Sequence, residues 1–135
     1  MDFLKPYSGV LLSLFRFMIG LVLLAHGTTK YLNFPEGPMN NASPATMGGF
    51  AGILELVGGV LLILGLFTRP TAFILSGLCA VAYFYAHAPR GFYPILNGGE
   101  LAVVLAFALL YIAAAGGGSV SVDRAIRGPE ASSLA

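Results

Sequence analysis

The stretch GGFAGILELVGGVLLILGLF, residues 48–67, decides the fold class of this chain. It is long and apolar enough to cross a bilayer as a helix, and it carries one charged residue, Glu55. Gly52, Glu55 and Gly59 follow each other by three and four residues, so a helix places them on one stripe. Because small residues let another backbone approach closely, we expect this stripe to face protein and not lipid.

Glu55 itself has two interpretations. A carboxylate at membrane depth is costly unless it is paired, protonated or hydrated. It could be a structural ion pair or hydrogen bond that locks the helices together. It could equally be a redox, proton-transfer or ligand site, because ionisable groups inside membranes are rare and tend to be functional. The sequence around Glu55 favours neither.

The composition of the whole chain points to a membrane protein. Of its 135 residues, 57% are hydrophobic and 10% are charged, whereas soluble domains carry about 25% charged residues. The mean hydropathy is +0.84. A net charge of +1 without a basic cluster excludes a nucleic-acid partner. The single cysteine, Cys79, excludes an intrachain disulfide and a cysteine-built metal site.

Four apolar segments predict an all-α membrane fold, a four-helix bundle in up-down-up-down order that makes one domain of residues 1–135. The expected spans are about 8–28, 48–67, 71–87 and 97–115, followed by a polar tail, 116–135. Arg16 interrupts the first segment and no A-x-A-like site follows it. We therefore interpret this segment as an uncleaved span and not as a signal peptide.

The distribution of basic residues predicts that both termini lie in the cytoplasm. The inner side would hold Lys5, Arg69, Arg124 and Arg127, and the outer side Lys30 and Arg90. The expected location is the cell (inner) membrane, crossed several times and in contact with membrane lipids.

Polar residues at the outer ends of the spans form the predicted site. They are His26, Lys30, His87, Arg90, Asn97 and Glu100. Glu55 lies roughly 10 Å deeper along its helix. We predict a polar cavity open to the outer face, with Glu55 and Arg16 at its floor and Tyr83 and Tyr85 in its walls. Asn97 is also expected to cap the fourth helix, with Glu100 in the first turn.

Each of these residues also has a structural interpretation. His26 and His87 could be ordinary interfacial residues, and Lys30 and Arg90 could only set topology or touch lipid headgroups. Glu100 could be only a partner of the helix dipole. No third ligand accompanies the two histidines at a suitable spacing, so we predict no metal site.

Several short motifs, in their order and helical placement, resemble the DoxX family of small four-helix membrane proteins over nearly the whole chain. The matching pieces are Arg16, His26-Gly27 with Lys30, residues 53–59, residues 65–72, Ala82-Tyr83 with His87, Gly91-Phe92, residues 97–101 and residues 119–123. The resemblance implies links to quinone-coupled and thiol-redox systems such as thiosulfate oxidation, often as the membrane partner of another subunit. By this resemblance, the expected functional residues are Arg16, His26, Lys30, Glu55, His87 and Glu100. The chain departs from a self-contained thiol oxidase because it has no second cysteine.

Three functions remain open from the sequence. The first is a membrane subunit that supports quinone or quinol redox chemistry in a larger assembly and need not be catalytic by itself. Histidine, a carboxylate and tyrosine near an interface can supply the hydrogen bonds and protons that a quinone headgroup needs. The second is a structural or assembly subunit, including self-association, in which Arg16 and Glu55 could pair internally. The third is a transporter of a small solute.

Overall fold

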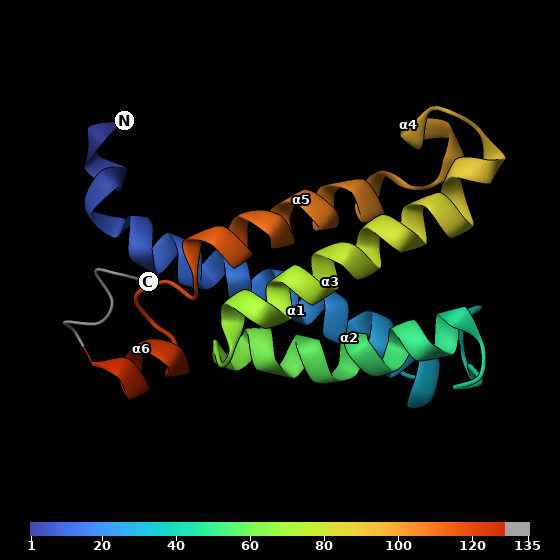
Figure 1. Cartoon of the computed structure of the whole chain (residues 1–135), viewed down its shortest axis with the longest axis horizontal. Coiled ribbons are helices and arrows are strands. Elements are labelled where there is room, and N and C mark those ends of the chain that lie inside the picture. Colours follow the sequence, from blue (N-terminus) through green and yellow to red (C-terminus); the bar gives the residue numbers. More distant parts are fainter. Residues whose placement is uncertain (129–135) are drawn as a thin grey trace.

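The computed structural model describes residues 1–128, and these residues form helices and loops without a strand. The elements in chain order are η1 (Asp2–Tyr7), α1 (Ser8–Tyr31), α2 (Met47–Leu64), α3 (Thr68–Ala82), η2 (Tyr83–His87), η3 (Ala88–Arg90), α4 (Pro94–Asn97), α5 (Glu100–Ala115) and α6 (Val122–Arg127). Helices α1, α2, α3 and α5 form a bundle in which successive helices run in alternating directions (Figure 1). Helix α1 packs mainly on α2, and α3 packs mainly on α5.

The two ends of the bundle differ in what they hold. We call the end with η1, the turn at 65–67 and α6 the tail end, at the left of Figure 1. We call the opposite end, with loop 32–46 and residues 83–99, the loop end. Every polar cluster described below belongs to one of these ends.

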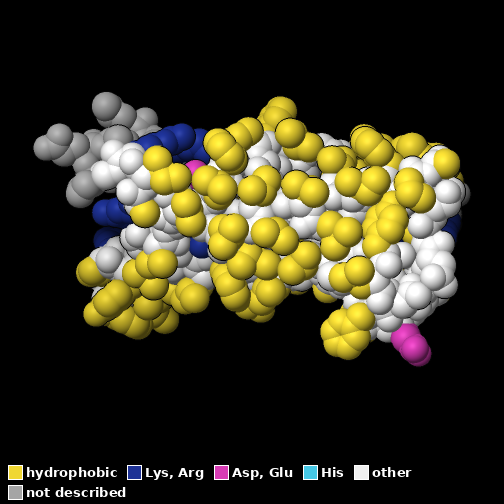
Figure 2. Space-filling view, turned by 90° about the horizontal axis from the view of Figure 1, so that it is seen from below, with side chains coloured by type: hydrophobic (Ala, Val, Ile, Leu, Met, Phe, Trp, Pro, Cys, Tyr) yellow, Lys and Arg dark blue, Asp and Glu magenta, His cyan; other side chains and the backbone are white. Residues whose placement is uncertain are grey.

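Three helical stretches are long and apolar enough to cross a membrane, namely Asp2–Tyr31, Met47–Leu64 and Thr68–Arg90. The remaining apolar helix, α5, has 16 residues. The described chain is therefore an all-helical protein with three to four apolar helices, compatible with a membrane bundle. Figure 2 agrees, because hydrophobic side chains cover the middle of the face it shows and Lys and Arg side chains gather mainly at the tail end.

Helix α2 has the exposure pattern of a membrane helix and not of a soluble one. Its lipid-side positions include Phe50, Ile53 and Val57, which are 55%, 41% and 58% exposed. Its buried positions are Gly49, Gly52, Glu55, Gly58, Gly59 and Leu62. The predicted orientation of the Gly52–Glu55–Gly59 stripe toward protein is thus confirmed. The same holds for α1, whose buried set includes Ser13, Arg16, Gly20 and Gly27.

Glycines bring the backbones of α1 and α2 into contact. A Cβ atom on Gly27 would lie 2.8 Å from the backbone nitrogen of Leu56, and one on Gly59 would lie 2.8 Å from that of Leu24. Such distances leave no room for any side chain. In lipid, where burial of apolar surface gives little driving force between helices, this close packing is a main source of association.

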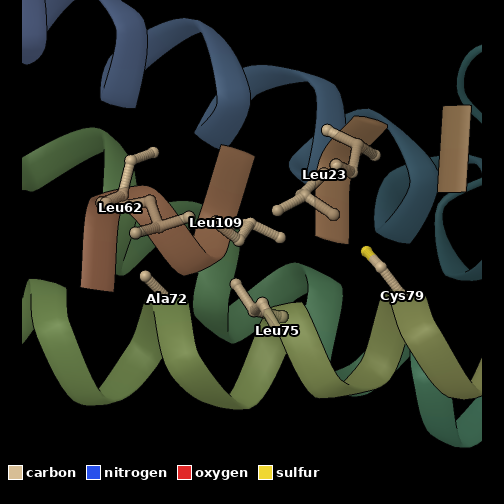
Figure 3. Close-up of a cluster of buried hydrophobic side chains, with 8 residues drawn as sticks. Leu23, Leu62, Ala72, Leu75, Cys79 and Leu109 are labelled. Atoms are coloured by element: carbon tan, nitrogen blue, oxygen red, sulfur yellow. The ribbon is translucent and has the colours of Figure 1, made fainter. Parts of the chain in front are cut away.

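A small apolar core joins all four long helices. It contains Leu23, Leu62, Ala72, Leu75, Cys79, Leu105, Leu109 and Ile112. Figure 3 shows these side chains converging from the helices into one interior space. Cys79 is a member of this cluster and is only 7% exposed, so its thiol acts here as a packing group.

Two predicted boundaries are wrong by about one turn. The connection between the second and third helices is Gly65–Phe67 and not 68–70, because α3 already begins at Thr68. The last long helix begins at Glu100 and not at 97, since Asn97 ends the separate short helix α4. The expected cap is wrong as well: Gly99 is the N-cap of α5, and its N–H donates to Asn97 Oδ1 at 2.8 Å.

Candidate functional site

Lys30 and Glu55 form a buried ion pair between α1 and α2. Lys30 Nζ lies 2.7 Å from Glu55 Oε2, and the two side chains are 6% and 11% exposed. Gly52, one turn before Glu55, leaves the space through which the Lys30 stem runs, because a Cβ there would lie 2.9 Å from Lys30 Cδ. Gly52 thus leaves room for the Lys30 side chain, and Glu55 neutralises its charge.

Arg16 does not reach Glu55, so the predicted Arg16–Glu55 pair and the place of Arg16 at the cavity floor are wrong. Its guanidinium donates to the carbonyl oxygens of Gly117 at 2.7 Å and Val120 at 3.0 Å, with a longer contact to Ile63 at 3.5 Å. These partners lie at the tail end, roughly 12 Å along α2 from Glu55 at helical rise. Carbonyl oxygens of the non-helical backbone after α5 therefore accept from the two terminal guanidinium nitrogens of Arg16, where an acid was the expected partner.

Asn97 is the centre of a second polar cluster, at the loop end. It is 2% exposed. Its side-chain nitrogen donates to Gly91 O at 2.9 Å and to the Tyr83 hydroxyl at 3.2 Å. Together with the Gly99 bond, these contacts satisfy backbone groups around the break between α4 and α5. Buried non-helical backbone requires such partners.

Tyr83 and His87 enter the same cluster from a π-helical segment, η2. Their rings lie 6.5 Å apart at an interplanar angle of 29°. His87 Nδ1 lies 3.2 Å from Asn97 O. Because a carbonyl oxygen only accepts, Nδ1 must carry the hydrogen, which leaves Nε2 as the proton-accepting nitrogen of the neutral ring. Single π turns inside α-helices occur frequently at functional sites.

An apolar groove of about 340 Å³ begins at Tyr83 and runs between α3 and α5. Its lining comprises Ser76, Ala80, Tyr83, Phe84, Ala102, Val103, Ala106, Phe107 and Leu110. Alanines on both helices keep it open, and Ser76 Oγ donates to Ala106 O at 2.6 Å across its base. Tyr83 is therefore shared between a polar cluster and an apolar groove. The groove was not predicted from the sequence, although the alanines at helical spacing are its signal.

The comparisons with known proteins agree with this architecture. The DoxX family model matches residues 11–88. The chain belongs to the DoxX family. An uncharacterized protein of Haemophilus influenzae is 43% identical over 128 residues, which cover 91% of this chain and 96% of that protein. A second uncharacterized protein of the same organism is 36% identical over 73 residues, 54% of this chain and 48% of the relative. No solved structure matches the chain significantly.

The DoxX residues predicted to share one outer cavity divide into two clusters and several separate side chains. Lys30 and Glu55 pair between α1 and α2, whereas Tyr83, His87 and Asn97 cluster between α3, η2 and α4. Arg16 binds carbonyl oxygens at the tail end. The other predicted residues make no side-chain hydrogen bond within residues 1–128: His26 is half-buried, and Tyr85, Arg90 and Glu100 are exposed. Among the described residues, no three His, Cys, Asp or Glu side chains are grouped to hold a metal ion.

The tail end contains a residue that the sequence reading of this DoxX protein missed, Asp123. Its carboxylate accepts the backbone N–H groups of Phe67 at 2.8 Å and Thr68 at 2.9 Å, at the start of α3. Burial raises the pKa of Asp123, but the backbone and side-chain hydrogen bonds from Thr68, the backbone hydrogen bond from Phe67 and the charge of Arg127 outweigh it, so the net pKa is lowered. The signal was present in the sequence, because Ser121 two residues earlier is a typical N-cap and accepts from Arg124 N.

Proposed function

We propose that this DoxX protein is a subunit of the inner membrane that binds a quinone or quinol and supports quinone-linked redox chemistry in a larger assembly. The proposal rests on one observation, the position of Tyr83 at the junction of the loop-end polar cluster and the apolar groove. A quinone has the same division, with a polar headgroup attached to an apolar isoprenoid tail. Quinone supplies reversible two-electron, two-proton chemistry when bound.

The side chains present fit such a headgroup. The Tyr83 hydroxyl accepts from Asn97 Nδ2, which leaves its own hydrogen for a quinone carbonyl oxygen. His87 directs Nδ1 to Asn97 O. Its other ring nitrogen, Nε2, would act as a proton acceptor toward a quinol hydroxyl in the Nδ1–H tautomer. The groove between α3 and α5 would hold the first part of the tail, over about 12 Å from Ala102 to Leu110 at helical rise.

The membrane arrangement proposed with this function has four crossings and both termini in the cytoplasm. The 16 residues of α5 span about 24 Å, less than the hydrocarbon thickness of about 30 Å. Residues 97–99 would therefore lie close to the outer headgroup layer, where protons are accessible. Arg69, Arg124 and Arg127 at the tail end favour the cytoplasmic side by the positive-inside rule.

A structural or assembly subunit is the second candidate, and the Lys30–Glu55 pair favours it. Both groups are buried and each satisfies the other, so this pair needs no ligand to explain it. The glycine-mediated contact of α1 with α2 gives the bundle a rigid half that a partner subunit could dock against. In this account, the hydrogen bonds of the loop-end cluster only satisfy the backbone groups at the break before α5.

The experiment that separates the two candidates is ligand retention. The full-length protein is purified in mild detergent, its lipids are extracted for quinone, and its thermal unfolding is followed with decylubiquinone. Quinone binding predicts co-extracted quinone and a rise in unfolding temperature. Tyr83→Phe should weaken decylubiquinone binding about 2- to 10-fold, as loss of one hydrogen bond does. Tyr85→Phe is the matched control, since Tyr85 lies in the same π segment but is 65% exposed.

A second pair of variants tests the groove. Ala102→Phe fills the groove and should reduce decylubiquinone binding, whereas Val104→Phe, at a position 61% exposed on the same helix, should not. Absence of co-extracted quinone together with no effect of decylubiquinone on unfolding would reject the redox proposal. The structural candidate would then remain.

A further inference from the structure

The tail end contains a second cavity, which is distinct from the apolar groove between α3 and α5 and is lined by cations. Its volume is about 280 Å³. Side chains of Arg69, Arg124 and Arg127 line it, and Asp123 is the one acid among its lining residues, which gives a net charge of +2. The backbone of Gly116–Gly118 and Phe67 complete the wall. Nothing in the proposed function at the loop end uses this cavity.

The three arginines reach the cavity from two helices, Arg69 from α3 and the exposed Arg124 and Arg127 from α6. Arg124 and Arg127 are three residues apart on α6, so they share one face. Arg69 is anchored by one guanidinium nitrogen, which donates to Ala113 O and Ala114 O at the end of α5. Its other guanidinium nitrogens make no hydrogen bond within the described residues. Asp123 already occupies the first N–H groups of α3, so an anion here would be held by guanidinium groups and not by the helix dipole.

A buried hydroxyl lies in the wall of this cavity. Thr68 is 1% exposed. Its Oγ1 lies beside the Asp123 carboxylate, and a side-chain hydrogen bond from Thr68 contributes to the lowered pKa of Asp123. Asp123 thus binds both the backbone and the side chain of Thr68, which fixes α6 against the start of α3 at the cavity wall.

We propose that this tail-end cavity binds an anionic phosphate group, of the kind carried by anionic phospholipids. The Phe67 and Pro70 side chains, which line the cavity, are exposed. Hydrophobic side chains also cover the middle of the face of the bundle that Figure 2 shows. A phosphodiester would be bound by the arginines while its acyl chains lie along that surface. Basic pockets between helices at this level of a membrane bind such headgroups in general.

The test is a binding titration of the full-length protein in detergent with three probes. These are short-chain phosphatidylglycerol, phosphatidylcholine with the same chains, and inorganic phosphate. We expect phosphatidylglycerol to bind more tightly than phosphatidylcholine, and more weakly as salt rises. Arg124→Gln and Arg127→Gln should each lower the phosphatidylglycerol affinity about fivefold. Lys5→Gln is the matched control, because Lys5 is an 80% exposed tail-end cation outside the cavity.

Each outcome bears on the proposal. Preference for phosphatidylglycerol that depends on Arg124 and Arg127 supports it with a lipid as the source of phosphate. Binding of inorganic phosphate with the same dependence, but no lipid preference, supports the anion site with a soluble source. Equal binding of both lipids without phosphate binding, or an equal loss in Lys5→Gln, would overturn it. Circular dichroism of each variant shows that the fold is retained, and quinone retention is measured separately.

Discussion

Lys30 Nζ lies 2.7 Å from Glu55 Oε2 in the interior of the bundle, and this pair joins the last turn of α1 to the middle of α2. Replacing Glu55 by Gln leaves the ammonium of Lys30 buried without a counter-charge. We expect this change to lower the free energy of unfolding by about 3–5 kcal/mol. The double variant Lys30→Met/Glu55→Leu should be close to wild type, since no charge is left behind.

Thermal unfolding in detergent, followed by circular dichroism, measures both effects. Glu100→Gln is the control, because Glu100 is exposed and should tolerate the change. If Glu55→Gln unfolds at the wild-type temperature, the pair does not stabilise the bundle. If the double variant is stable but loses quinone binding, Glu55 has a role beyond structure.

Gly65 is a position where a methyl group should be strongly unfavourable. Its φ is +70°, and a Cβ there would clash with Arg16 Nη1. We expect Gly65→Ala to destabilise by about 2 kcal/mol or more, from backbone strain and displacement of Arg16. Gly77→Ala is the opposite case, because Gly77 lies inside α3 with nothing within 4 Å of a new Cβ. That variant should be more stable by about 0.5–1 kcal/mol. Equal unfolding temperatures for the two variants would contradict this account of the turn.

Asp123 should make the stability of the tail end depend on acid pH. Its pKa is lowered in the folded protein, below the usual value of about 3.9. The resulting stabilisation is therefore fully present above about pH 4 and is lost as pH falls through the folded pKa. Asp123→Asn should lower the free energy of unfolding at neutral pH by about 1 kcal/mol. Its unfolding temperature should then fall less than that of the wild type as the pH is lowered. Unfolding temperatures from pH 7 to pH 2 measure this. Asp2→Asn, at an 86% exposed site, should show the same fall in unfolding temperature at acid pH as the wild type.

Asn97 should be the most sensitive residue of the loop end. Asn97→Ala leaves Gly91 O and the Gly99 N–H without their partners, which we expect to cost about 2–4 kcal/mol. Hydrogen–deuterium exchange should show faster exchange of the Gly99 amide, while α1 and α2 stay protected. Unchanged protection of Gly99 would mean that other groups hold the break before α5.

The sequence predicted which faces of the helices are buried, because lipid imposes a simple rule. Glycine, serine and charged residues at helical spacing must face protein, and Ser13, Arg16, Gly52 and Glu55 all do. The partners of these side chains were harder to predict. A helical period shows which face of a helix is buried, but it does not show which residue of which neighbouring helix lies opposite. Lys30 appeared to be an end-of-span residue, yet its long stem carries the ammonium inward to Glu55.

The contacts of the tail end could not be derived from periodicity at all. Arg16 binds carbonyls of residues 117 and 120, more than one hundred positions away in a segment without a helical period. The interpretation of residues 116–135 as a polar tail concerns residues that lie partly outside the described range. Within that range, α6 is ordered by Ser121 and by the contact of Asp123 with α3. The π turn at Tyr83 likewise depends on tertiary packing.

The hydrogen bonds of Arg16 also constrain the order of events during synthesis. A ribosome makes Arg16 long before it makes Gly117 and Val120, whose carbonyls the guanidinium needs. The first helix must therefore enter the translocon with its cation still hydrated or held by lipid phosphate, and Arg16 gains its carbonyl partners only after residues 117 and 120 have been synthesised. A reporter or purification tag inserted between α5 and α6 would interrupt that last step, so nascent chains carrying one should be the preferred substrates of membrane quality-control proteases.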